Sequence, residues 1–205
     1  MQRPCQAKNV GFYGDFFDVN NAVNTKSEAK RHTAAPCVTI HGPTYNTETR
    51  ENPMQQLIDR LKLVPHPEGG FYREVYRSGQ AVSSSATKAP RQALTHIYFL
   101  LLKGQVSRFH RVLHDEVWNY YEGAPLRLLR WHGATIEEQL IGPGEANYCT
   151  TIVGGDFQAA ESCGDYTLVG CTVAPGFDFA DFTFADNSQW LIVPEQARQT
   201  YQRFR

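Results

Sequence analysis

The pattern of hydrophobic and polar positions changes at about residue 52. Residues 1–51 show no sustained periodicity and contain one aromatic cluster, GFYGDFF, at residues 11–17. Such a segment does not bury a packed core, so we expect a flexible arm, either mobile or ordered by laying these aromatic side chains on a neighbouring surface. The folded part of the chain is therefore predicted to be a single domain over residues 52–205.

A short helix is predicted directly after this arm. Asn52 is a suitable N-cap, and Pro53 suits the first helical position. Apolar residues spaced three and four apart then form one stripe, which consists of Met54, Leu57, Ile58 and Leu61. We expect this helix to pack against the outside of a larger body.

From residue 65 onward, short runs typical of strands replace the helical pattern. Runs such as FYREVYR, LTHIYFLLL and YTLVGCTV are separated by turn sequences such as PHPEGG, EGAP and APG. Many short strands with glycine and proline between them are typical of an all-β sandwich or barrel. No repeat of about 20–50 residues is visible, which disfavours a propeller or a solenoid.

Composition and charge exclude several functional classes. The 20 basic and 21 acidic residues nearly cancel, so no attraction to nucleic acid or to an anionic membrane is expected. No apolar run approaches the ~20 residues that span a bilayer, and residues 1–30 resemble neither a signal peptide nor a transit peptide. The five cysteines include no CxxC pair, so reduced thiols are expected. We therefore predict a cytoplasmic protein without nucleic-acid or membrane partners.

The stretch GQVSRFHRVLHDEVWNYYEG, residues 104–123, resembles the first motif of the cupins, a superfamily of jelly-roll barrels. That motif is usually written G-x5-H-x-H-x3-4-E-x6-G, and the residues with matching spacing are Gly104, His110, Glu116 and Gly123. Val112 stands where the second histidine belongs. The stretch GCTVAPGFDFADF resembles the second cupin motif, with Phe179 at the position of its histidine.

Further motifs resemble one cupin branch of largely unassigned function. They include PHPEGGFYREVYRS, IYFLL and VGCTVAPGFDF, and the resemblance extends over residues 65–182. One departure is Asn119, where members of this branch often have histidine. The resemblance implies a double-stranded β-helix, the cupin jelly-roll barrel, with a short N-terminal helix. It also implies that the protein pairs as a homodimer.

Metal binding is one interpretation of the barrel pocket. Cupins normally hold zinc, iron or manganese with three imidazoles and one carboxylate, and this chain matches those positions only at His110 and Glu116. Val112 and Phe179 replace the other two ligands and have no donor atom. Two protein ligands rarely hold a transition metal, so we expect no metal cofactor.

Metal-free acid–base chemistry is the interpretation that we favour, as in the sugar-nucleotide epimerases of the cupin superfamily. A histidine paired with a carboxylate titrates near neutral pH, where proton transfer is efficient. His110 with Glu116 or Asp181 is the expected pair, and Tyr120 the expected proton donor. Strand alternation and the resemblance predict that the substrate-binding side chains are Arg108, which would clamp an anionic group, together with Trp118, Phe177, Phe179 and Glu74.

The favoured function is thus a small-molecule-binding cupin that acts as a biosynthetic isomerase, epimerase or lyase. Two alternatives stay open, a non-catalytic metabolite-binding protein and a metal-dependent oxygenase with a reduced ligand set. His66 lies between two prolines and is expected to be a turn residue, whereas Glu68 is a weaker site candidate because it belongs to the PHPEGG motif. The identity of the substrate does not follow from the sequence.

Overall fold

The N-terminal helix begins where its sequence predicts. The computed structural model describes residues 52–186, 188, 193 and 195–205, so the predicted arm lies outside the described residues. Helix α1 (Pro53–Leu61) is capped by Asn52, whose side-chain oxygen accepts a hydrogen bond from the backbone N–H of Met54 at 3.0 Å. Leu57 and Ile58 are buried in a cluster with two sheet residues, Leu100 and Leu168. The apolar stripe therefore attaches the helix to the outside of the sheet.

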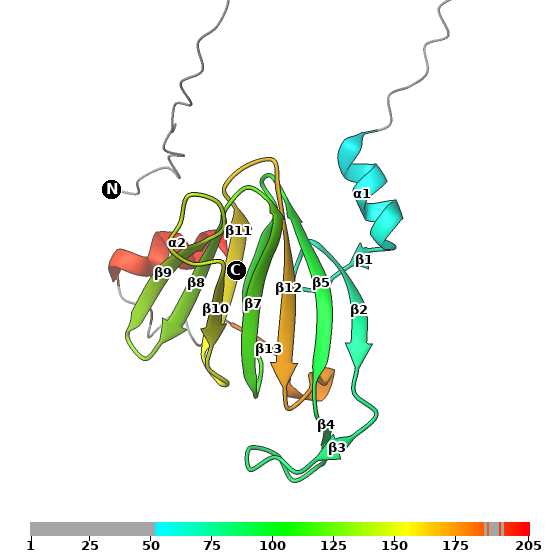
Figure 1. Cartoon of the computed structure of the whole chain (residues 1–205). Coiled ribbons are helices and arrows are strands. Elements are labelled where there is room, and N and C mark those ends of the chain that lie inside the picture. Colours follow the sequence, from blue (N-terminus) through cyan, green and yellow to red (C-terminus); the bar gives the residue numbers. More distant parts are fainter. Residues whose placement is uncertain (1–51, 187, 189–192, 194) are drawn as a thin grey trace, which may run out of the picture. The chain divides into compact units, whose positions relative to one another are not determined.

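Strands are the main regular element of the described chain (Figure 1). They are β1 (Val64–Pro65), β2 (Phe71–Arg77), β3 (Ala81–Val82), β4 (Arg91–Gln92), β5 (Thr95–Leu102), β6 (Val106–Arg111), β7 (Asp115–Gly123), β8 (Leu126–His132), β9 (Thr135–Ile141), β10 (Cys149–Ile152), β11 (Phe157–Ser162), β12 (Tyr166–Ala174) and β13 (Thr183–Phe184). The remaining elements are η1 (Phe179–Asp181), η3 (Glu195–Ala197) and helix α2 (Arg198–Arg203). The predicted all-β class with a short N-terminal helix is confirmed.

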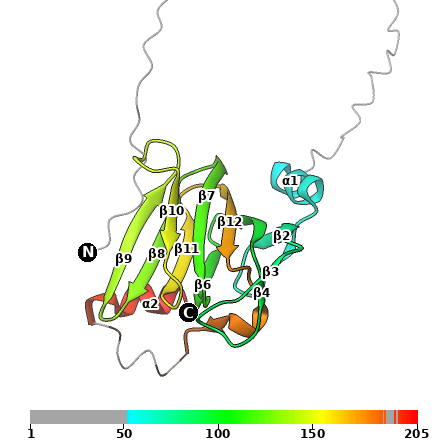
Figure 2. The same cartoon turned by 60° about the horizontal axis from the view of Figure 1, so that its bottom comes forward.

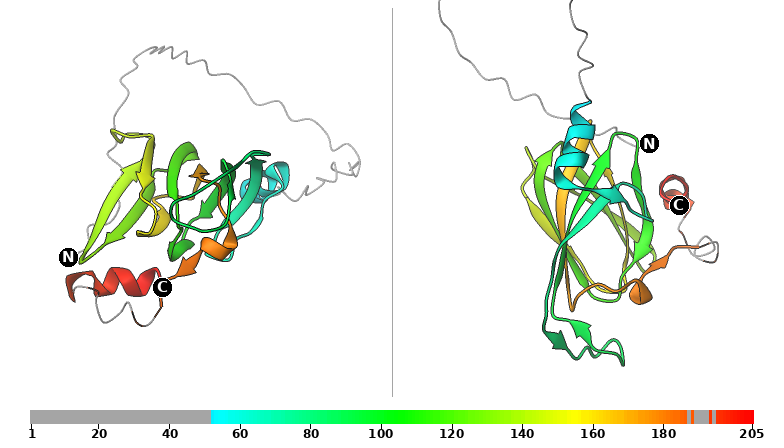
Figure 3. Two further views of the ribbon diagram at one scale, coloured as in Figure 1. Left: turned by 90° about the horizontal axis from the view of Figure 1, so that it is seen from below. Right: turned by 90° about the vertical axis from the view of Figure 1, so that its right-hand side faces the viewer.

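Two antiparallel sheets face each other (Figure 3). The six-stranded sheet has the order β1-β2-β5-β12-β7-β10, and the five-stranded sheet has the order β13-β6-β11-β8-β9. Strands distant in the chain are neighbours in both sheets, as in a jelly roll, because β12 returns to lie between β5 and β7. Apolar side chains from both sheets, among them Phe99, Trp118, Leu128 and Ile141, form the core between them.

A second core lies on the outer face of the five-stranded sheet. Phe109 and Trp131 project there and pack against Tyr201 of α2 and Phe204 just after it. Figure 2 shows α2 crossing next to the lower ends of β8 and β9. Because α2 and Phe204 cover this face, Leu128 and Leu129, which are neighbours on β8, are both buried, one in each core, and ordinary half-buried alternation does not predict this.

A β-bulge in β6 changes which of its side chains point inward. On β11 the partners Gln158 and Ala160 are two residues apart, whereas their partners on β6, His110 and Ser107, are three apart. The extra residue breaks the alternation, so Ser107 and His110 are both buried while Arg108 is exposed. The expectation that Arg108 shares the inward face with His110 is wrong for this reason.

The segment after β12 is also not the strand that its sequence suggests. Residues 179–181 form the turn η1, and its N-cap Asp178 accepts a hydrogen bond from the backbone N–H of Ala180 at 2.9 Å. This turn directs Asp181 to Arg91, whose guanidinium donates two hydrogen bonds of 2.7 Å to the carboxylate. The expectation that Asp181 could be the carboxylate partner of His110 is therefore corrected.

Two further expectations concern the whole chain. Cys149 and Cys171 are free thiols as expected, whereas Cys163 is disulfide-bonded, so the expectation of reduced thiols fails at that position. All described residues belong to one compact unit. None of the helices among them has the length and apolar character needed to cross a membrane.

Candidate functional site

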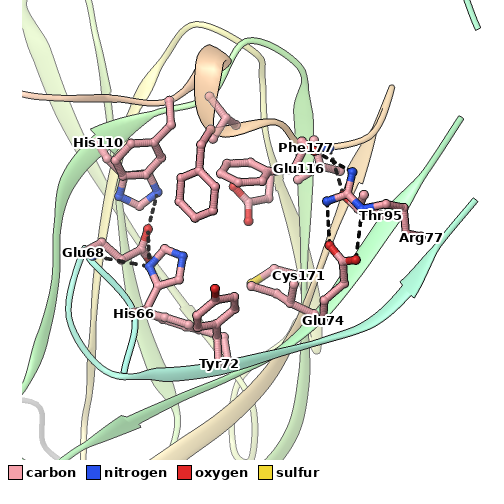
Figure 4. A pocket seen from close by; sticks show the side chains of 16 residues that line it. His66, Glu68, Tyr72, Glu74, Arg77, Thr95, His110, Glu116, Cys171 and Phe177 are labelled. Carbon is pink, nitrogen blue, oxygen red and sulfur yellow. Dashed lines mark hydrogen bonds and ion pairs between the residues drawn. The ribbon is translucent and has the colours of Figure 1, made fainter. Parts of the chain in front are cut away.

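A cavity of about 300 Å³ lies inside the barrel. Five of the predicted site residues line it, namely Glu74, His110, Glu116, Phe177 and Phe179. The other lining residues are His66, Glu68, Tyr72, Arg77, Thr95, Ile97, Phe99, Val112, Cys171, Val173 and Phe182 (Figure 4). They come from β2, β5, β6, β7 and β12, the turn before β2, the connection between β6 and β7, and the segment that follows β12.

Four predicted site residues lie elsewhere. Arg108 donates a hydrogen bond to the Pro67 carbonyl at 2.7 Å and lies over the Phe184 ring, and Asp181 is paired with Arg91. Trp118 and Tyr120 do point inward with Glu116, but they belong to the packed core beyond the cavity. The Tyr120 hydroxyl donates to the Gly123 carbonyl at 2.6 Å. Alternation along β7 therefore predicts the inward side of these residues but not their depth in the barrel.

The bulge in β6 orients the imidazole of His110. Nδ1 lies 2.7 Å from the backbone oxygen of Arg108. A carbonyl oxygen can only accept, so Nδ1 bears the proton of the neutral ring and Nε2 is an acceptor. Nε2 lies 3.1 Å from a carboxylate oxygen of Glu68. The side chain is 2% exposed, so its reactive nitrogen is held in a nearly dry environment.

The carboxyl group in direct contact with His110 is that of Glu68. From the sequence, Glu116 or Asp181 was expected as this partner. The turn that contains Glu68 joins β6 through the backbone N–H of Arg108, which donates to the Glu68 carbonyl at 2.9 Å. Ser107 donates to the Glu68 carboxylate, also at 2.9 Å. Gly69 has a φ of 114°, and a Cβ on it would collide with the Val106 carbonyl oxygen. The paired glycines of PHPEGG therefore allow the turn to approach β6 closely.

His66 lies in the same turn and faces the cavity instead of solvent (Figure 4). The backbone N–H of Glu68 donates to its Nδ1 at 3.3 Å, so the proton of the neutral ring is on Nε2. Its side chain is 7% exposed and lies 3.5 Å from the Glu68 carboxylate. The expectation of a plain turn residue is therefore incomplete, because this turn folds inward.

Glu116 is joined to His110 by the amide of Gln158. Nε2 of Gln158 lies 2.5 Å from the Glu116 carboxylate and 3.1 Å from Nε2 of His110. The amide oxygen of Gln158 accepts a hydrogen bond of 2.9 Å from the indole N–H of Trp118. Cys171 provides a further hydrogen bond to Glu116. All polar side-chain atoms that are buried among the described residues have a partner.

Burial shifts the pKa values of these groups toward their uncharged forms. It raises the pKa of Glu68 to about 8, although the Ser107 hydrogen bond and the Arg108 charge oppose this shift. It raises the pKa of Glu116 to about 7, with the charge of His110 opposing it. Burial and the charge of His110 lower the pKa of His66 to about 4, and burial also lowers that of His110. At neutral pH the cavity thus contains neutral imidazoles beside a protonated carboxyl group.

Aromatic side chains form one wall of the cavity. Phe182 stacks on His110 with ring centroids 5.1 Å apart and an interplanar angle of 19°. Phe179 stacks on His66 at 6.3 Å and 24°, and Phe177 packs edge-on against Phe179 at 5.0 Å. Phe179 is 53% exposed, which places it at the rim. This wall can contact a ring or an acyl chain and exclude water from the histidines.

The arginine that lines the cavity is Arg77, since Arg108 points away. Its Nε and Nη2 lie 3.0 and 2.6 Å from the two carboxylate oxygens of Glu74. Its Nη1 donates to the Phe177 carbonyl at 3.2 Å. This ion pair therefore connects β2 to the aromatic wall, and its charges compensate each other at the mouth of the cavity.

The arrangement does not fit the metal site of other cupins. Nε2 of His110 faces Glu68 and Gln158, and the Glu116 carboxylate accepts from the Gln158 amide. Val112 and Phe179 both line the cavity and offer no donor atom. Among the described residues, no three His, Cys, Asp or Glu side chains are grouped so that they could hold a metal ion.

Sequence reasoning missed His66, Gln158 and Cys171 and gave Glu68 little weight. For His66 and Glu68 a signal exists, because polar residues within the patterned PHPEGG motif and its paired glycines indicate a turn that approaches another backbone. For Gln158 and Cys171 no local signal exists. Each lies within an ordinary strand sequence and enters the site only through strand pairing.

Comparison with known proteins agrees with this geometry. The two-sheet barrel with an internal site defines a cupin-type protein. Residues 55–185 match the family described as Cupin superfamily (DUF985), and the chain belongs to that family.

Several relatives and solved structures are similar to this chain. Uncharacterized protein YML079W of Saccharomyces cerevisiae is 27% identical over 168 residues, which cover 71% of this chain and 83% of that protein. A hypothetical protein from Leishmania major is 32% identical, covers 75% of this chain and 97% of its own, and has a TM-score of 0.65. Protein SO0799 from Shewanella oneidensis is 33% identical, covers 73% and 95%, and has a TM-score of 0.66.

Proposed function

We propose that the barrel cavity is the active site of a metal-free acid–base enzyme of the isomerase, epimerase or lyase type. The contact between Nε2 of His110 and the carboxyl group of Glu68, at 3.1 Å inside the barrel, is the observation that supports this most directly. Neutral His110 can accept a proton, and Glu68, with a pKa near 8, can hold one at neutral pH. An acceptor and a donor thus face the same small volume.

Isomerisation, epimerisation and elimination each need one proton removed from the ligand and one returned to the ligand or to its leaving group. In this proposal Nε2 of His110 accepts the first proton, and Glu68 or Tyr72 supplies the second. The Tyr72 hydroxyl points into the cavity (Figure 4), so Tyr72 takes the role first assigned to Tyr120. Glu116 supplies a second carboxylate with a pKa of about 7. Such positioned acid–base groups contribute roughly 10²–10⁴-fold to rate.

The ligand class that best matches the cavity is a small, uncharged or weakly polar ring. A volume of about 300 Å³ is at the lower end of the range for ligand sites. The charged groups at its mouth, Glu74 and Arg77, already pair with each other. The aromatic wall favours a flat apolar surface.

Hydrogen–deuterium exchange into the ligand tests this proposal. The small molecule that co-purifies with the protein, identified by native mass spectrometry, is incubated with enzyme in D₂O and followed by NMR. We expect catalysed exchange or conversion, and a fall of about 100-fold or more in His110→Ala and Glu68→Gln. Asp165→Asn, an exposed site on the β11–β12 turn, is the matched surface control and should not change the rate.

Two outcomes would contradict parts of the proposal. Binding of the co-purified molecule without exchange or conversion would favour the alternative function, a metabolite-binding protein. The satisfied polar groups of the cavity are the observation that favours this alternative. Stoichiometric iron, manganese or zinc in protein purified without chelator, lost in His110→Ala, would contradict the metal-free mechanism.

A further inference from the structure

Gln158 has a place in the site that its strand sequence does not suggest. It is fully buried, at 0% exposure, on β11 of the five-stranded sheet, whereas Glu116 and Trp118 belong to β7 of the opposite sheet. Its amide contacts three side chains, Trp118, Glu116 and His110. It therefore connects the two sheets next to His110 and Glu116, two residues that line the cavity.

Trp118 determines which way the amide of Gln158 points. An indole N–H can only donate, so the group that it contacts at 2.9 Å must be the amide oxygen. The NH₂ group is consequently directed to the cavity side, where Nε2 reaches the Glu116 carboxylate at 2.5 Å and Nε2 of His110 at 3.1 Å. One of its protons is directed at the Glu116 carboxylate, and the other faces Nε2 of His110, whose single lone pair also faces the Glu68 carboxyl group at 3.1 Å.

The orientation of the Gln158 amide affects the protonation states of Glu116 and His110. An amide N–H directed at a carboxylate stabilises the ionised form of Glu116, and one directed at Nε2 stabilises the neutral ring of His110. Glu68 receives a side-chain hydrogen bond from Ser107 and none from Gln158. Of the two carboxyl groups, the amide therefore acts only on Glu116, and it favours the release of the proton from that group.

We propose that Gln158, oriented by Trp118, is a positioning residue that makes Glu116 the proton-releasing carboxyl group of the cavity and keeps Nε2 of His110 an acceptor. This role of Gln158 matters for catalysis only if the cavity has the proposed acid–base function. The charged and titratable groups that face Glu116 from the neighbouring elements are His110, Glu68 and Cys171. None of these carries an amide that could replace Gln158.

The test uses the full chain without any ligand and follows the Glu116 carboxyl carbon by NMR during a pH titration. We expect Gln158→Met, which keeps length and apolar volume but has no amide, to raise the titration midpoint of Glu116 by about one pH unit. Trp118→Phe removes the orienting N–H together with part of the ring volume but leaves the amide in place, so it should give a smaller rise. Thr167→Val deletes a buried side-chain hydrogen bond remote from the cavity and should leave the midpoint unchanged.

A second measurement needs no variant. The ¹⁵N shifts of the His110 ring in the native protein at neutral pH should show the proton on Nδ1 and none on Nε2. A proton on Nε2, or the same Glu116 midpoint in Gln158→Met as in the native chain, would overturn the proposal. Failure of the exchange assay with these results intact would instead overturn only the proposed catalysis, because neither measurement involves turnover.

Discussion

The two ends of the barrel interior are built by the same strands and yet bury different chemistry. On β7, Glu116 lines the cavity, and Trp118, two residues later, is in the packed core. On β5, Ile97 lines the cavity while Leu101 is fully buried. The packed end is filled by apolar side chains from both sheets, whereas the cavity end is bounded by polar groups that satisfy one another.

This difference shows that alternation decides the side of a sheet but not the depth of a residue. The polar end forms where the turn of residues 66–70 folds against β6 and where the β6 bulge turns both Ser107 and His110 inward. The aromatic segment after β12 then covers this end. A site has formed at the end of the barrel where backbone irregularities are concentrated, as is common for β-bulges near functional sites.

The largest effect is expected on the free energy of unfolding when one isoleucine is truncated at the packed end of the barrel interior and another at the cavity end. Ile141→Ala opens a new void in the packed core and should lower the free energy of unfolding by about 2–5 kcal/mol. Ile97→Ala only enlarges an existing cavity, so its cost should be smaller by at least about 1 kcal/mol. Urea denaturation of both variants measures the difference. Equal losses would mean that the cavity end is packed as tightly as the core.

The next largest effect is the pH dependence of stability that Glu68 causes. Burial raises its pKa to about 8 in the folded protein from the usual 4.5, so the folded state binds the extra proton between these values. The stability from that proton is complete below pH 4.5 and is lost as pH rises through 8. Between pH 6.5 and 8.5 this loss should be about 2 kcal/mol in the native chain and absent in Glu68→Gln. Urea denaturation across this range measures it, and parallel curves would contradict the assignment.

The smallest effect distinguishes the structural role of Tyr120 from the proposed catalytic role of Tyr72. Tyr120→Phe removes the hydrogen bond to Gly123 and should lower stability by about 1 kcal/mol without changing ligand exchange. Tyr72→Phe should leave stability nearly unchanged and slow exchange by about tenfold or more, because its hydroxyl faces the cavity. Thermal melts and the exchange assay together give both values. The opposite pattern would return the catalytic role to Tyr120.

The cupin fold and a part of the site, five of the sixteen residues that line the cavity, follow from sequence pattern. The spacing of Gly104, His110, Glu116 and Gly123 and the turn residues between strands predict the barrel, and His110 and Glu116 do line its cavity. The positions of Arg108 and Asp181 were not predictable, because a bulge and the turn η1 interrupt the alternation on which they depended. A single inserted residue reverses the direction of side chains without altering the local sequence pattern.

The sequence by itself determined the start of α1, the all-β class and the inward position of His110 and Glu116. Only the tertiary structure decided that Glu68 is the partner of His110 and that Gln158 joins His110 to Glu116, which is 42 residues away from Gln158 in the chain. The physical reason is that strand and turn propensities act between near neighbours. The pairing of buried polar groups arises only when the sheets close and each group must find a hydrogen-bond partner away from water.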